Sequence, residues 1–182
     1  MSLFSVPNRE SVTESNQAIF DQLQRGLGFV PNLYATFAHS RTALGTYLAL
    51  QNAKSSLRAR EREAINLAVS QVNECAYCLA AHTALGKAQG FTDEQILDLR
   101  EGRAPWNDKL DALAAFARQT TEQRGKPSTE TVQALLDAGY DRGNVVDAIV
   151  IIGDKIISNY LHGITQIPVD FPAAAALETA AA

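Results

Sequence analysis

The sequence predicts an all-α protein of about eight helices. Apolar residues recur with helical spacing along most of the chain, for example at Leu57, Ala64, Leu67 and Ala68. No stretch alternates apolar and polar residues at a period of two for long, as a half-buried strand would. Since 46% of the 182 residues are hydrophobic, the chain has enough apolar side chains to bury one core.

Polar caps and breaks set the expected helix boundaries. Pro31, for example, disfavours helical geometry at Val30 and so separates the first helix from the second. The side chains expected to cap helix starts are Thr13 or Ser15, then Ser40, Ser56, Thr92, Asn107 or Asp108, Ser128 and Asp141. The expected helical segments cover about 13–26, 32–38, 40–50, 57–72, 75–89, 92–102, 107–123, 128–139 and 141–163.

The later helices end at glycines, which are favoured just beyond a helix C-terminus. Gly90 and Gly139 end two of them, and Gly125-Lys126-Pro127 is a break between two more. We expect one domain over residues 1–172. The alanine-rich segment 173–182 is expected to be disordered.

Composition argues against several classes of partner. The chain has 16 basic and 20 acidic residues, a net charge of −4, and its basic residues are scattered, so we expect no nucleic-acid or membrane binding. The best apolar stretch, 145–152, is interrupted by Asp147 and is far shorter than the ~20 residues of a membrane helix. The N-terminus has no basic region followed by an apolar one, so we expect no signal peptide and a cytoplasmic protein.

Two cysteines, Cys75 and Cys78, are the only ones in the chain. In a reducing compartment such a pair is more often catalytic or metal-binding than structural, and a disulfide closing so small a loop would stabilise the fold little. On a helix, residues three apart share a face with Cβ atoms ~5–6 Å apart, which is near disulfide reach. His82, four residues after Cys78, lies on the same predicted stripe.

This stripe is suited to thiol chemistry. Cys75 is expected in the first turn of its helix, where unpaired amides and the helix dipole favour a thiolate. A thiolate attacks a peroxide oxygen or a disulfide, and His82 can accept or relay the thiol proton. The thioredoxin interpretation of Cys-x-x-Cys requires a βαβ context, which this chain lacks.

Simpler interpretations remain open beside this one. Both cysteines and His82 could be ordinary core residues, and Glu63 could be a solvated helix residue beside two arginines. A zinc site would need a fourth ligand, and the chain offers no second Cys/His pair. We therefore expect no metal and no cofactor.

The segment 57–91 resembles the core of the AhpD-like alkylhydroperoxidases, within the carboxymuconolactone decarboxylase superfamily. The shared pattern is a glutamate, Glu63, twelve residues before the Cys-x-x-Cys and a histidine, His82, four residues after it. Residues 159–162 and 167–170 resemble the peroxidase-related branch more loosely. The resemblance implies an AhpD-like helical bundle that forms a homo-oligomer, a trimer or hexamer. Because the superfamily's decarboxylases lack the cysteine pair, the presence of this pair argues against a lactone decarboxylase.

The resemblance also implies an activity, the reduction of a small hydroperoxide in antioxidant defence. Glu63 and His82 would relay protons to the dithiol, Cys78 would be the peroxidatic thiolate and Cys75 the resolving thiol. The helix-dipole argument alone favours Cys75 as the more acidic thiol, so this assignment stays open. The expected reductant is a dithiol, a lipoyl carrier or a thioredoxin-type protein.

Tyr77 is a departure from the family pattern, because the alkylhydroperoxidase of the lipoyl system has a histidine there. A second relay imidazole is therefore missing, and Tyr77 and His162 are candidates for the wall of a pocket. The alternative function is a redox-responsive dithiol/disulfide switch with little peroxidase turnover.

Overall fold

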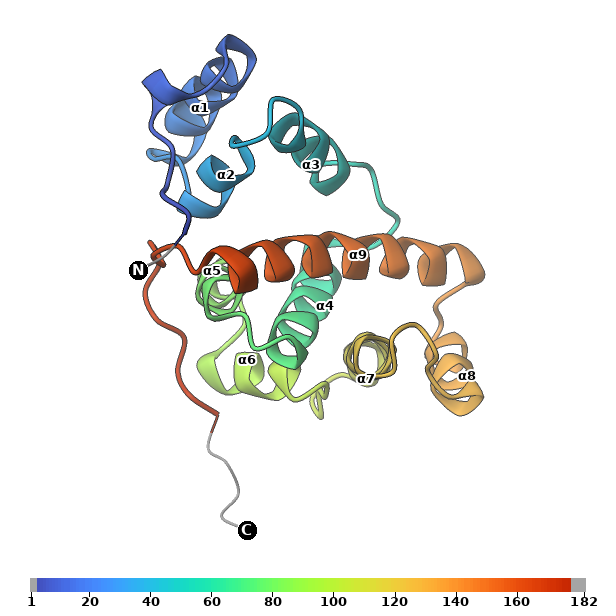
Figure 1. Cartoon of the computed structure of the whole chain (residues 1–182). Coiled ribbons are helices and arrows are strands. Elements are labelled where there is room, and N and C mark those ends of the chain that lie inside the picture. The colour runs from blue at the N-terminus through green and yellow to red at the C-terminus, as the bar shows by residue number, and fades with distance from the viewer. Residues whose placement is uncertain (1–2, 178–182) are drawn as a thin grey trace.

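The computed structural model describes residues 3–177 and is all-helical over that range (Figure 1). Within those residues there are nine α-helices, one 3-10 turn at Arg9–Ser11, and no strand. This confirms the predicted fold class. The helices are α1 (Glu14–Leu27), α2 (Asn32–Phe37), α3 (Ala43–Gln51), α4 (Ala59–Val72), α5 (Ala76–Ala88), α6 (Asp93–Arg100), α7 (Asp108–Glu122), α8 (Thr129–Asp137) and α9 (Arg142–Thr165).

Most predicted helix starts are confirmed by their capping hydrogen bonds. The side chains of Thr92, Asn107, Ser128 and Asp141 each accept a hydrogen bond from the backbone N–H three residues later. Each bond satisfies an amide that the first turn of the helix leaves without a partner.

Two predicted caps are wrong. α3 begins at Ala43 rather than after Ser40, although the Ser40 hydroxyl accepts hydrogen bonds from the backbone N–H groups of Thr42 and Ala43. α4 begins at Ala59, and the Ser56 hydroxyl donates instead to Asp147 of α9, at 2.7 Å. The carboxylate of Glu61 accepts from the N-cap backbone N–H of α4, at 2.8 Å.

Helix α4 is the centre of the molecule, because α5, α6, α7 and α9 all pack against it. Five of its apolar side chains have no exposed surface, those of Ala64, Ile65, Leu67, Ala68 and Val69. A helix that is apolar on several sides is stable in water only when neighbours cover each side. Burying a side chain the size of leucine or isoleucine contributes ~1.5–3 kcal/mol, so α4 supplies much of the apolar stabilisation.

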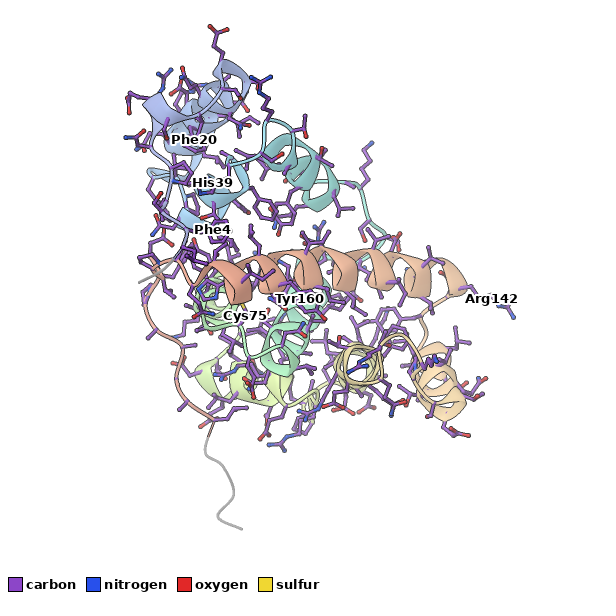
Figure 2. All side chains as sticks on the ribbon, in the orientation of Figure 1. Phe4, Phe20, His39, Cys75, Arg142 and Tyr160 are labelled. Carbon is purple, nitrogen blue, oxygen red and sulfur yellow. The ribbon has the colours of Figure 1, made fainter. Side chains whose placement is uncertain are left out.

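The long helix α9 crosses the molecule, with α1–α3 on one side of it and α4–α8 on the other (Figure 1). The N-terminal helices form a second apolar cluster in which Phe20, Leu33 and Leu44 are buried with both cysteines. Phe4 packs edge to face on His39, which joins the N-terminal extension to the end of α2 (Figure 2). The cysteines therefore lie where the N-terminal cluster meets α5 and α9.

After α9, residues 167–177 continue without regular secondary structure. The Asp170 carboxylate accepts from the Asn32 N–H at 2.7 Å, and the Arg100 guanidinium donates to the Ala175 carbonyl at 2.6 Å. Part of the segment predicted to be disordered thus contacts α6, and its last residues, 178–182, lie outside the described range. In residues 3–177 we find no helix with the length and hydropathy needed to cross a membrane.

Candidate active site

The two cysteines lie at the start of α5, where Cys75 is the N-cap. Its Sγ accepts the backbone N–H of Cys78 at 3.4 Å, the bond that a serine or aspartate usually provides at this position. Both side chains are buried, and the two thiols are free rather than joined in a disulfide. The spacing predicted from the sequence therefore brings the two sulfur atoms together as a reduced dithiol.

The surroundings of the dithiol favour ionisation of one thiol over the other. The Cys75 thiol donates to the Cys78 sulfur and so lowers the pKa of Cys78 well below its ordinary 9.0, with further help from interactions with Lys155 and His82, while burial opposes the shift. The same hydrogen bond, together with burial, raises the pKa of Cys75. This order favours Cys78 as the thiolate, opposite to the helix-dipole argument.

Glu63 of α4 and His82 of α5 form the pair that the sequence pattern suggested. The Oε2 of Glu63 lies 2.7 Å from Nδ1 of His82, and both side chains are nearly buried. Asn66 donates to the other carboxylate oxygen at 3.1 Å. Burial alone would raise the pKa of Glu63, but its electrostatic interaction and hydrogen bond with His82, together with Lys155, outweigh it, so that the pKa is lowered. The carboxylate is therefore ionised at neutral pH and accepts the Nδ1 proton.

Lys155 of α9 is a site residue that the sequence analysis missed. Its side chain is only 2% exposed, and its Nζ lies 2.9 Å from Nε2 of His82. Since Nδ1–H of His82 donates a hydrogen bond to Glu63, we assign Nε2 of His82 as the acceptor and the ammonium of Lys155 as the donor. The carboxylate of Asp154 is 3.7 Å from the same Nζ. A lysine this deeply buried is rare unless it is paired.

The only sequence signal for Lys155 was an acidic–basic pair, Asp154-Lys155, within an otherwise apolar part of the last helix. Its neighbour one turn on, Ser158, has its hydroxyl oxygen 3.7 Å from the Cys78 sulfur, and this hydrogen bond helps to lower the pKa of Cys78. Lys155 and Ser158 are three residues apart and so lie on one face of α9. That face is the one turned toward α5.

A cavity of about 240 Å³ opens beside these groups. Its wall is mostly apolar and aromatic, and its polar side chains include Gln51, Cys78, His82, Lys155 and Ser158. The apolar lining residues come from the N-terminal helices, α5 and the C-terminal segment, and include Leu27, Phe29, Pro31, Leu33, Tyr34, Tyr47, Leu85 and Phe171. An apolar pocket with a few convergent polar groups is the usual form of a small-molecule site.

The two residues predicted to line a pocket have different positions. Tyr77 lines this cavity, and its hydroxyl donates to Asp170 at 2.6 Å and accepts the Leu33 N–H at 3.2 Å. His162 packs against the Tyr77 ring, with centroids 5.5 Å apart, and its Nε2 donates to the Ile167 carbonyl at 3.2 Å. These contacts give His162 a role in holding the end of α9 to the segment that follows it.

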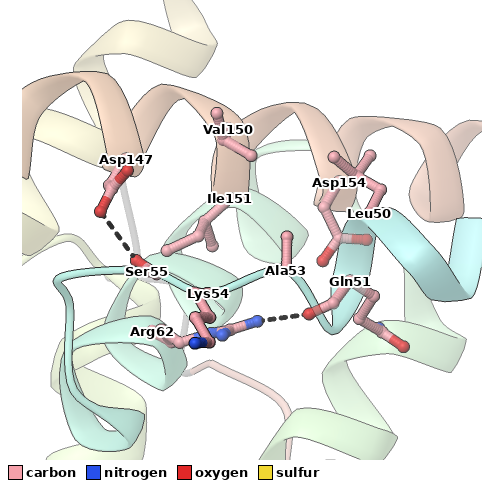
Figure 3. Close-up of a pocket in the computed structure, with 10 residues that line it drawn as sticks. All are labelled: Leu50, Gln51, Ala53, Lys54, Ser55, Arg62, Asp147, Val150, Ile151 and Asp154. Carbon is pink, nitrogen blue, oxygen red and sulfur yellow. Dashed lines mark hydrogen bonds between the residues drawn. The ribbon is translucent and has the colours of Figure 1, made fainter.

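A second, more polar cavity of about 470 Å³ lies against the Glu63–His82 pair. Arg62, Glu63, Asn66 and Asp154 line it together with His82, so the imidazole lines both cavities. A third hollow, bounded by Ser55, Arg62 and Asp147, has a volume of only about 20 Å³, which suits about one water molecule (Figure 3). Within residues 3–177, no group of three or more His, Cys, Asp or Glu side chains is placed to hold a metal ion.

Comparison with known proteins finds similar sequences and similar folds. The family model described as the carboxymuconolactone decarboxylase family matches residues 35–119, which include Glu63, both cysteines and His82. The structure of an alkylhydroperoxidase AhpD core, an uncharacterized peroxidase-related protein from Ralstonia eutropha JMP134, superposes with a TM-score of 0.83. It is 22% identical and the match covers 93% of this chain and 92% of that one. The segment 35–119 thus matches the carboxymuconolactone decarboxylase family, and the chain has the fold of the AhpD core.

Other proteins are also similar in fold or in sequence. An uncharacterized peroxidase-related protein from Silicibacter sp. TM1040 gives a TM-score of 0.79 at 24% identity, over 96% of this chain and 92% of that one. The debrominase Bmp8, a Cys-to-Ala variant in complex with 2,3,4-tribromopyrrole, gives a TM-score of 0.75 at 16% identity. The match covers 93% of this chain and 94% of that one. The uncharacterized protein YdfG of Bacillus subtilis (strain 168) is 28% identical over 54% of this chain and 69% of its own length. These identities show a shared fold rather than a shared substrate, and Lys155 lies beyond the matched segment.

Proposed function

We propose that the protein is a thiol-dependent hydroperoxide reductase. The observation that carries the proposal is the arrangement of Cys78, whose sulfur receives the Cys75 hydrogen bond at the wall of an apolar cavity, next to the Glu63–His82 pair. A lowered thiol pKa beside a specific set of charged partners is typical of a functional cysteine. The match of residues 35–119 to the family model, together with the shared AhpD fold, supports an enzyme of this general type.

The reaction proceeds in two steps. The Cys78 thiolate attacks the terminal oxygen of a hydroperoxide, so that an S–O bond forms, the O–O bond breaks and an alcohol leaves after protonation. The Cys75 thiol then attacks the sulfenic acid and releases water, which leaves a disulfide and oxidises the dithiol by two electrons. An external dithiol, such as a lipoyl carrier or a thioredoxin-type protein, reduces the disulfide again.

The cavity supports an organic rather than an inorganic peroxide. Its aromatic wall, with Tyr34, Tyr47 and Phe171, gains free energy by burying an apolar group that hydrogen peroxide does not have. We further propose a cytoplasmic antioxidant role and a homo-oligomer. The oligomer is supported by a row of large apolar side chains exposed on α9, of which Tyr160 is labelled in Figure 2: Val146, Ile149, Val150, Ile157, Tyr160 and Ile164.

The alternative, a redox switch, also has a structural argument. Tyr77 lies between the two cysteines in the sequence. Its hydroxyl donates a hydrogen bond to Asp170 and accepts one from the Leu33 N–H in the first turn of α2. Forming the disulfide would rearrange the first turn of α5 and so disturb this contact. A switch of this kind would change assembly or partner binding on oxidation, with little turnover.

One experiment separates the two functions. Reduced protein is mixed with one equivalent of cumene hydroperoxide, and thiol content and intact mass are followed for the unmodified chain, Cys78→Ser and Cys75→Ser. A reductase loses both thiols rapidly, with a mass decrease of two hydrogens, and Cys75→Ser accumulates a sulfenic acid. Thiol loss no faster than that of a free thiol in solution would refute the reductase and leave the switch.

A further inference from the structure

Both ring nitrogens of His82 are engaged by other side chains. Nδ1 is bonded to Glu63 at 2.7 Å and Nε2 to the ammonium of Lys155 at 2.9 Å. An imidazole hydrogen-bonded on both sides has no proton or lone pair directed at a sulfur atom or a substrate oxygen. The group at the end of this hydrogen-bonded chain is therefore Lys155, which lines the same cavity as Cys78.

We propose that Lys155 is the proton donor to the leaving oxygen of the hydroperoxide, with Glu63 and His82 holding its ammonium group in position. The inference rests on the proposed reductase function and names a residue outside the matched family segment. Lys155 of α9 and Cys78 of α5 both line this cavity. A peroxide bound there would have the thiolate at its terminal oxygen and the ammonium at its alkoxide oxygen.

The proton balance of this cycle closes. When the Cys78 thiolate attacks, the O–O bond breaks, and the alkoxide takes a proton from Lys155 to leave as an alcohol. The Cys75 proton leaves with the water that is formed with the disulfide. When an external dithiol reduces the disulfide, it releases two protons, and one of them returns to Cys75. Because Cys78 returns as a thiolate, the second proton is available for the amine of Lys155.

Acidic groups lie around the Lys155 side chain. Asp154 lies 3.7 Å from its Nζ, the ionised Glu63 acts through His82, and the Cys78 thiolate shares the cavity. Arg62, which lines the polar cavity, donates to the Gln51 carbonyl at 2.6 Å and so is directed to a partner other than the peroxide (Figure 3).

The test uses two oxidants that differ in how much they need a proton donor. Cumene hydroperoxide expels an alkoxide, which is a poor leaving group without a proton. Peracetic acid expels a carboxylate, whose acid is as strong as a side-chain carboxyl group and which leaves without help. Stopped-flow rates of Cys78 oxidation by both are measured for the unmodified full-length protein, Lys155→Met and Lys155→Arg. Lys126→Met is the matched control, because Lys126 is exposed in a loop.

Each rate is divided by the rate of Cys78 alkylation with iodoacetamide at the same pH, which corrects for any change in the fraction of thiolate. We expect the corrected rate of Lys155→Met with cumene hydroperoxide to fall by ~10²-fold or more, the usual contribution of a general acid. The corrected rate with peracetic acid should change by less than about threefold. Lys155→Arg should also be slow with cumene hydroperoxide, because a guanidinium keeps the charge but does not give up its proton.

Three outcomes would overturn the inference. Equal losses with both oxidants would mean that Lys155 acts only through the thiolate or the fold. An unchanged rate with cumene hydroperoxide would mean that another group donates the proton. If the unmodified protein reacts with both oxidants no faster than a free thiol, the reductase function itself fails, and the inference with it.

Discussion

The Nζ of Lys155 lies 2.9 Å from Nε2 of His82, although the two residues come from different helices and are 73 positions apart in the chain. This contact extends the Glu63–His82 pair to three residues, from α4 through α5 to α9. Each of these helices packs against the others, so the three side chains are fixed by the core. A site built on packed helices keeps its geometry better than one built on loops.

The first prediction concerns Glu63. In Glu63→Gln the residue at position 63 is neutral, so His82 is no longer held as an Nδ1–H donor to a carboxylate. We expect turnover of cumene hydroperoxide to fall by ~10²-fold, at the lower end of what acid–base groups contribute. Steady-state kinetics with a dithiol donor would measure it. Glu94→Gln, at an exposed position in the first turn of α6, should leave the rate unchanged.

The same variant tests the pH dependence of stability. Folding lowers the pKa of Glu63 from 4.5, so its carboxylate stabilises the native state above 4.5. This contribution is lost as the pH falls through the lowered pKa. Urea unfolding followed from pH 7 downward should therefore show a smaller acid loss of stability in Glu63→Gln than in the unmodified protein. Parallel curves for the two proteins would contradict this assignment.

The second prediction concerns the ionisation of the dithiol. Because the Cys75 hydrogen bond is the largest cause of the lowered pKa of Cys78, Cys75→Ala should raise that pKa toward 9.0. Cys75→Ser should raise it less, since a hydroxyl can both donate to the Cys78 sulfur and cap α5. Alkylation of Cys78 with iodoacetamide as a function of pH measures the shift. Identical profiles for Cys75→Ala and Cys75→Ser would show that the hydrogen bond is unimportant.

How far the site could be predicted follows from which residues are local in the sequence. Cys75 and Cys78 are one helical turn apart, and His82 lies one turn further, so their proximity follows from helix geometry alone. Glu63 lies on another helix, and its partner was identified through the family pattern rather than from spacing. Lys155 is joined to this group only by the packing of α9.

The helix boundaries show the same dependence on distant contacts. Ser128 and Asp141 cap their helices as predicted, because the amide that each satisfies is three residues away. Ser56 was predicted to cap α4, but Asp147 lies close in the fold and accepts hydrogen bonds from both the hydroxyl and the backbone N–H of Ser56. A charged acceptor from another helix binds such donors more strongly than a neutral one, and no local pattern reports it.

The third prediction concerns Tyr77. In Tyr77→Phe the Leu33 N–H loses its acceptor and Asp170 loses a donor, in a region where Leu33 and Tyr77 are both buried. We expect a loss of ~1–3 kcal/mol in the free energy of unfolding, the cost of a buried polar group left without a partner. Tyr160→Phe is the control. Because Tyr160 is 59% exposed, removing its hydroxyl should change the free energy of unfolding little. Equal unfolding midpoints in urea would mean that the Tyr77 hydroxyl contributes nothing to stability.

The last prediction compares two glycines that end helices in left-handed geometry, Gly102 at φ 76° and Gly139 at φ 90°. Alanine at either position pays the left-handed strain of roughly 1–2 kcal/mol. At Gly139 an added Cβ has open space, whereas at Gly102 it would lie 2.6 Å from Cδ and 2.8 Å from Cβ of Arg118.

Arg118 has little freedom to move aside, because its guanidinium donates to the Glu101 carbonyl at 3.0 Å and to the Glu122 carboxylate at 2.8 Å. Its Cβ, moreover, is fixed by the backbone of α7. We therefore expect Gly102→Ala to lose ~1–3 kcal/mol more in the free energy of unfolding than Gly139→Ala, as overpacked sites do. Urea titrations of the two variants measure the difference. Equal losses would mean that the backbone, not the contact with Arg118, sets the cost at Gly102.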